Sequence, residues 1–76
     1  MTDVITYQIR ASQFSHPEQT EGQHANGPPN IFVRVNNGHW FIADGFRSIS
    51  KVESAISKLG FELFVTQYLL PIKEMK

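Results

Sequence analysis

Residues 31–46, IFVRVNNGHWFIADGF, decide the fold, because they hold two apolar runs joined by an Asn-Gly pair. Asn37-Gly38 is the preferred centre of a two-residue type I′ turn, since both central positions require positive φ. The stretch therefore predicts an antiparallel hairpin. Its register sets these residues opposite each other: Asn36 and His39, Val35 and Trp40, Arg34 and Phe41, Val33 and Ile42, and Phe32 and Ala43.

Both faces of this predicted hairpin are apolar. A hairpin that is exposed on one side alternates apolar and polar residues along each strand. With the register above, one face receives Val33, Val35, Trp40 and Ile42, and the other receives Phe32 and Phe41. The second face therefore needs a cover of its own.

The chain before the hairpin divides into a strand and a long polar segment. Residues 4–11 alternate with period two and predict a strand that buries Ile5, Tyr7, Ile9 and Ala11. Residues 15–30, SHPEQTEGQHANGPPN, have no aliphatic periodicity and contain three prolines. Loops longer than about 12 to 15 residues are usually functional or mobile, and a disordered excursion is the simplest interpretation.

The chain after the hairpin predicts one helix and a last strand. Apolar residues recur at spacings of three and four between Ile49 and Leu59, which indicates a helix of roughly three turns. Ser48 or Ser50 can cap its start, with Ser50 and Glu53 as a capping box, and Gly60 can end it. Residues 61–70, FELFVTQYLL, are rich in aromatic and β-branched residues and stop at Pro71, which is typical of a strand.

These elements predict one small α+β domain over residues 1–76, with a long polar loop at 15–30. The expected architecture is a four-stranded, mainly antiparallel sheet with one helix packed on one face, in the order β-β-β-α-β. The chain has no cysteine, so disulfides and thiolate metal sites cannot supplement its core. Packing or a partner has to stabilise it.

Charge and hydropathy exclude several classes of function. Seven Lys and Arg balance seven Asp and Glu, which argues against a sequence-independent grip on nucleic acid or an anionic membrane. The sequence has no basic segment followed by an apolar run at its start, and no run of about 18 apolar residues. We therefore expect a cytoplasmic protein.

The predicted second sheet face carries a surplus of aromatic rings. A helix of about 11 residues is roughly 17 Å long and 10 to 12 Å across, which is narrower than four strands spaced by about 4.8 Å. Four rings that each leave about 100 Å² to water form a patch that monomers rarely expose without a function. The cover could be the polar loop, a second copy or another protein, and we favour a protein because the loop offers little apolar bulk.

The residues that could carry chemistry form no recognisable constellation. His16 and His24 share a loop with Glu18 and Glu21, but this spacing is not that of a zinc site, and a solvated loop explains it. The serines lack a glycine-flanked elbow, and the carboxylates form no acid–base pair. We predict no catalytic residue, no metal and no cofactor, and we place Trp40 in the core beneath the helix.

The sequence thus predicts a non-enzymatic protein–protein interaction module of the small adaptor or inhibitor type, a description that also suits proteins carried by mobile elements. It would dock another protein, or a second copy as a homodimer, through the aromatic face. The predicted partner-binding residues are Phe32, Arg34, Phe41, Phe64, Tyr68 and Arg10. The alternative is single-stranded nucleic acid on the same face, with Arg10, Arg34 and Arg47 on phosphates, and an enzyme ranks third.

Overall fold

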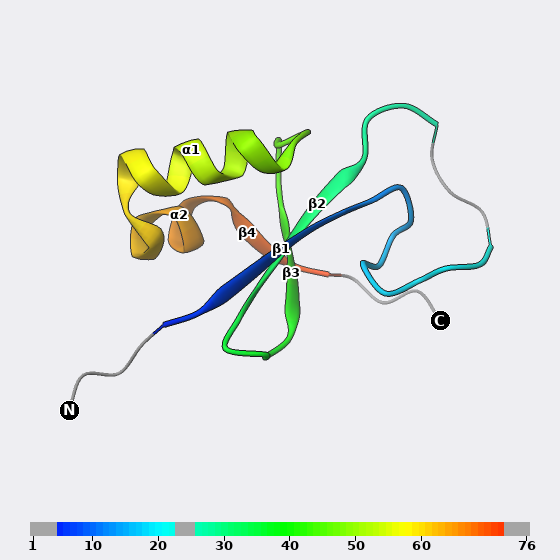
Figure 1. Cartoon of the computed structure of the whole chain (residues 1–76), viewed down its shortest axis with the longest axis horizontal. Coiled ribbons are helices and arrows are strands. Elements are labelled where there is room, and N and C mark those ends of the chain that lie inside the picture. The colour runs from blue at the N-terminus through cyan, green and yellow to red at the C-terminus, as the bar shows by residue number, and fades with distance from the viewer. Residues whose placement is uncertain (1–4, 23–25, 73–76) are drawn as a thin grey trace.

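A computed structural model of the chain describes residues 5–22 and 26–72. The described part forms an antiparallel four-stranded sheet in the order β1-β2-β3-β4, with two helices between β3 and β4 (Figure 1). The elements are β1 Tyr7–Ser12, β2 Asn30–Val35, β3 Trp40–Ala43, α1 Ile49–Leu59, α2 Phe61–Tyr68 and β4 Leu69–Pro71. The α+β class and the antiparallel sheet are confirmed, but the order is β-β-β-α-α-β. Val4, the expected first strand residue, lies outside the described residues.

The helix α1 has the predicted bounds. Ser48 is its N-cap, and the Ser48 side chain accepts a hydrogen bond from the backbone N–H of Lys51 at 3.3 Å. The capping box predicted for Ser50 and Glu53 does not form, because Ser50 already lies inside the first turn. Gly60 ends the helix at a φ of 87°, a value that glycine adopts without strain.

The strand predicted for residues 61–70 is wrong: the segment forms α2 and only then the short β4. A strand would have placed Phe64 and Leu63 on opposite faces, with Leu63 under the helix. In α2, Phe64 is fully buried, whereas Leu63 is 52% exposed. The ring of Phe64 packs against those of Tyr68, at 5.6 Å between centroids, and Phe46, at 5.5 Å. This packing overrides the β propensity of the segment.

The hairpin register is also displaced by one residue. Asn36 and Asn37, not Asn37 and Gly38, have positive φ, and the Gly38 N–H donates to the Val35 carbonyl at 2.9 Å. Asn36 is held by Thr6, whose carbonyl accepts from the Asn36 N–H at 2.8 Å. The resulting pairs are Phe32 with Ile42, Val33 with Phe41, and Arg34 with Trp40.

This one-residue displacement moves every β3 side chain to the other face of the sheet. Trp40 and Ile42 now share a face with Phe32, whereas Phe41 and Ala43 face the helices. The core therefore lies between the helices and the face that carries Val33. Its fully or almost fully buried residues are Ile31, Val33, Ala43, Val52 and Phe64.

The sheet face away from the helices is covered by the connection between β1 and β2. Phe32 is fully buried and Trp40 is 8% exposed on this face, and Pro17 of the connection is buried as well. The Asn30 side-chain amide donates to the Phe14 carbonyl at 3.1 Å, and that of Gln13 donates to the Gly27 carbonyl at 2.8 Å. In its described residues, the polar loop thus covers this face, and side-chain amides satisfy two of its backbone carbonyls.

Candidate functional site

The structure disperses the six residues predicted to bind a partner. Phe64 is in the core, and Phe32 is fully buried beneath the β1–β2 connection. Phe41 lies on the helix side of β3, and Tyr68, at the end of α2, packs edge-on against Phe46 at 5.1 Å between centroids. The predicted aromatic face therefore does not exist. The hairpin register turns Phe41 to the helix side, α2 places Phe64 in the core, and the loop covers Phe32.

Arg10 and Arg34 do remain on the face away from the helices, where they flank one ring. The guanidinium carbons lie 5.4 Å and 4.8 Å, respectively, from the centroid of the Trp40 ring. Arg34 also donates to the side-chain oxygen of Gln8. The sequence predicts Trp40 beneath the helix. In the structure, Trp40 instead lies beside the side chains of Arg10 and Arg34 and the loop that carries His16. Its indole Nε1 is buried without a hydrogen-bond partner within the described part of the chain.

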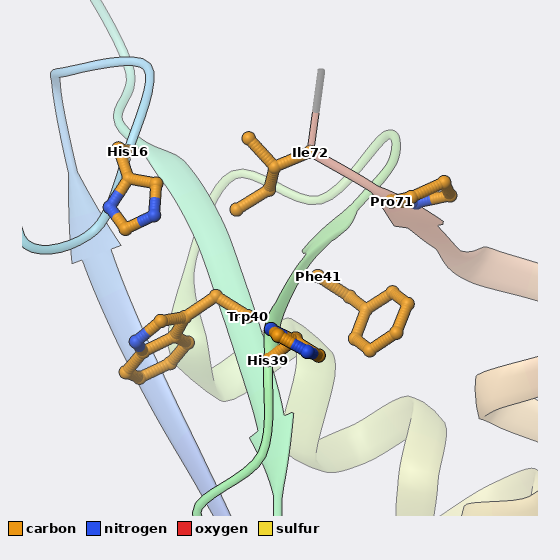
Figure 2. A pocket seen from close by; sticks show the side chains of 6 residues that line it. All are labelled: His16, His39, Trp40, Phe41, Pro71 and Ile72. Carbon is orange, nitrogen blue, oxygen red and sulfur yellow. The ribbon is translucent and has the colours of Figure 1, made fainter. Parts of the chain in front are cut away.

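A hollow of about 270 Å³ opens beside this tryptophan (Figure 2). Figure 2 shows the side chain of His16 extending from the loop on the side of the sheet away from the helices, with Ile72 near it. The lining residues are His16, His39, Trp40, Phe41, Pro71 and Ile72. The hollow thus offers imidazoles and apolar surface, and its lining contains no carboxylate.

The two loop histidines of the metal hypothesis do not build a site within the described residues. The Nδ1 of His16 accepts a hydrogen bond from the Glu18 N–H at 3.2 Å, so this nitrogen serves the loop itself. His24 lies outside the described residues. No group of three or more His, Cys, Asp or Glu side chains converges in residues 5–22 and 26–72.

A second surface lies on the helix side of the sheet, next to α2. There an open groove of about 810 Å³ runs between the first residues of the sheet and the helix. Ile5, which is 62% exposed, and Leu63, which is 52% exposed, both line it. The remaining lining residues are Val35, Asn36, Leu59, Gly60, Phe61, Glu62, Val65 and Thr66. Because Glu62 is the only charged residue of this lining, the groove is suited to apolar side chains.

β1 begins two residues after Ile5, which lines this groove, although no residue of β1 itself does. In an antiparallel pair, successive residues point their N–H and C=O groups alternately toward and away from the neighbouring strand. Thr6 bonds Asn36 of the neighbouring segment, so Tyr7, Ile9 and Ala11 direct their backbone groups away from β2. Among the described residues, no strand pairs with this edge.

Tyr7 connects the strand edge with the groove. Its ring stacks on Phe61, with the centroids 4.9 Å apart and the planes at 18°. Natural proteins protect an exposed strand edge with Lys, Pro or a bulge. The strand YQIRAS has none of these, and its single charge is Arg10. This edge and the groove beside it form the candidate site, which we name the β1-edge site.

The sequence contained a partial signal for this site. The absence of Lys and Pro in residues 7–12 could have indicated an open edge, but only if β1 was known to be the outermost strand. Leu63 carried no signal, because it was expected under the helix.

No protein-family model, curated protein or solved structure matches the chain. Within residues 5–22 and 26–72, neither helix is long and apolar enough to cross a membrane.

Proposed function

We propose that the chain is a non-enzymatic protein–protein interaction module of the small adaptor or inhibitor type, and that it receives an extended segment of a protein at the β1-edge site. The observation that carries the proposal is the coincidence of an unpaired strand edge with an apolar groove. An added strand pairs its backbone with Tyr7, Ile9 and Ala11 and directs alternate side chains over the groove. Peptide recognition by strand addition uses this division between backbone and side chains.

The expected affinity is modest. Covering about 200 Å² of apolar surface on Ile5 and Leu63 contributes up to about 5 kcal/mol at about 25 cal/mol per Å². Each new backbone hydrogen bond adds about 1 kcal/mol, and association costs at least about 4 kcal/mol. With six such bonds to Tyr7, Ile9 and Ala11, these magnitudes give at most about 7 kcal/mol, which corresponds to a reversible complex with a dissociation constant of about 10 μM or weaker.

The nucleic-acid alternative has less support than protein docking. Stacking of bases requires aromatic faces that a base can reach. Phe32 and Trp40 are buried, and Phe64 belongs to the core. The arginine side chains on that sheet face lie over the Trp40 ring, and the chain carries no net charge. These observations favour a protein as the partner.

Selection of short peptides against the intact chain tests the proposal. A phage-displayed library of random peptides, panned on the immobilised chain, should yield extended sequences with apolar residues at alternate positions. Upon addition of a selected peptide, amide hydrogen exchange measured by NMR should slow at Tyr7, Ile9 and Ala11. Peptides that protect other amides, or the absence of any selected peptide at a concentration where the chain is monomeric, would contradict the proposal.

Two exposed leucines provide a matched pair of variants for this experiment. Leu63→Lys places a charge in the groove and should weaken peptide binding at least about tenfold, or about 1.4 kcal/mol. Leu70→Lys changes a residue of similar exposure, 48% against 52%, on the opposite edge strand and should leave binding unchanged. Equal losses in both variants would show that the groove is not the binding surface.

A further inference from the structure

We infer that the segment received at the β1-edge site is β1 of a second copy, paired antiparallel about a two-fold axis at Ile9. This inference rests on the proposed function and names its partner. A two-fold interface requires a surface that is complementary to itself. The backbone groups, the side chains and the charge of β1 all meet this requirement.

The backbone of β1 is complementary to itself about Ile9. The outward N–H and C=O groups belong to Tyr7, Ile9 and Ala11, which are spaced evenly around the central residue. Antiparallel pairing of Ile9 with Ile9 of the partner subunit sets Tyr7 opposite Ala11 of the partner subunit. All outward groups of these three residues then find partners in both copies, whereas a register centred on Tyr7 or Ala11 leaves some unpaired.

The side chains fit this register on both faces of the sheet. On the helix side, the large ring of Tyr7 meets the small Ala11 of the partner subunit, and the two Ile9 side chains meet each other. On the other side, Arg10 lies opposite Gln8 of the partner subunit, so no like charges face each other directly. An Arg–Gln contact already exists within the chain, where Arg34 donates to Gln8.

The charge of the whole chain permits this association. The formal net charge is zero at pH 7, so two copies do not repel each other through their overall fields. β1 itself carries no carboxylate and no lysine. The product is a continuous sheet in which both outer β1 edges are paired, and the liability of an exposed strand edge disappears.

Cysteine cross-linking tests the register, because the natural chain contains no cysteine. Directly opposite residues of a hydrogen-bonded antiparallel pair have Cα atoms about 5.5 Å apart, within the range of a disulfide. Ile9→Cys should therefore form a covalent dimer under mild oxidation. Ala11→Cys is the control, because the two copies of residue 11 would lie about 13 Å apart along the strands and should not cross-link.

Sedimentation velocity over a wide concentration range measures the association without a cross-link. The natural chain should change from monomer mass to twice that mass as its concentration rises. Ala11→Pro removes an outward N–H while leaving the β1–β2 hydrogen bonds in place, and it should abolish the dimer. Ala11→Ser keeps the N–H and should retain it. Circular dichroism verifies that both variants are folded. If Ala11→Pro does not fold, the Ile9→Cys cross-link tests the dimer instead.

The outcomes separate this inference from the proposed function. A chain that stays monomeric, while selected peptides still protect Tyr7, Ile9 and Ala11, overturns the second copy as the partner and keeps the docking function. A dimer that survives in Ala11→Pro, or that fails to cross-link through Ile9→Cys, overturns the register. If the natural chain neither binds a selected peptide nor forms a dimer, both proposals are overturned.

Discussion

Leu63 and Phe64 are neighbours in the sequence with opposite environments in the fold. Leu63 is the more exposed of the two, at 52%, and Phe64 has no accessible surface. The reverse holds if the segment forms a strand beneath α1, as its composition predicts. These two side chains therefore distinguish the helix α2 from the expected strand.

Truncation of the two side chains should have very different effects on stability. Phe64→Ala removes a ring from the centre of the core and should lower the free energy of unfolding by about 3 to 5 kcal/mol, which is enough to unfold a domain of this size. Leu63→Ala should change it by less than about 0.5 kcal/mol. Urea denaturation followed by circular dichroism measures both values. If Leu63→Ala lowered the free energy of unfolding more than Phe64→Ala does, the result would support the predicted strand over α2.

At the scale of elements, α1 forms from its own sequence and α2 from its surroundings. The α1 stripe has regular helical spacing, a serine cap at Ser48 and a glycine stop at Gly60. By contrast, α2 starts at Gly60 without a side-chain cap. We therefore expect the stability of α1 to respond to its cap.

Ser48→Ala should lower the free energy of unfolding by about 1 kcal/mol, because the backbone N–H of Lys51 loses its acceptor. Ser57→Ala, on the exposed side of the same helix, should be neutral or slightly stabilising, since alanine has the higher helix propensity. Thermal denaturation of the two variants supplies the comparison. Equal effects would mean that Ser48 is not the cap.

The loop between β1 and β2 acts as an element because it buries Phe32 and Trp40. Replacing residues 13–22 and 26–29 by Gly and Ser, at unchanged length, should expose the only tryptophan of the chain. Its fluorescence emission should shift to longer wavelength, and quenching by iodide should increase. An unchanged spectrum would show that this connection does not shield Trp40.

At the level of the whole molecule, zero net charge and an open sheet edge together determine how association should respond to salt. Exposed charges are screened within about 10 Å at 0.1 M salt, and phosphate contacts weaken steeply as salt rises. Strand pairing and apolar burial do not depend on such contacts. The way in which the proposed association responds to salt would therefore report which forces hold two copies together.

The dissociation constant of the proposed dimer should change by less than about threefold between about 0.05 M and 0.5 M sodium chloride. Sedimentation velocity at several salt concentrations measures it. A steep loss of association at high salt would indicate that Arg10 and other charges, rather than the backbone edge and the groove, hold the copies together.

The amino-acid sequence alone predicts the elements that depend on neighbouring residues. The apolar spacing and flanking residues of α1 define its bounds, and the two apolar runs around Asn37 define a hairpin. An antiparallel α+β domain followed from these elements. Periodicity and capping are properties of neighbouring residues, so no distant contact was needed to predict them.

Which faces are buried depends on contacts between residues that are distant in the sequence. The hairpin register depends on Thr6, distant in the sequence, which bonds Asn36 and favours a turn one residue earlier. The helix α2 depends on rings brought together from separate elements, and the buried state of Phe32 depends on the loop that folds over it. Each choice is a competition between long-range contacts, and a local pattern contains no information about which contact prevails.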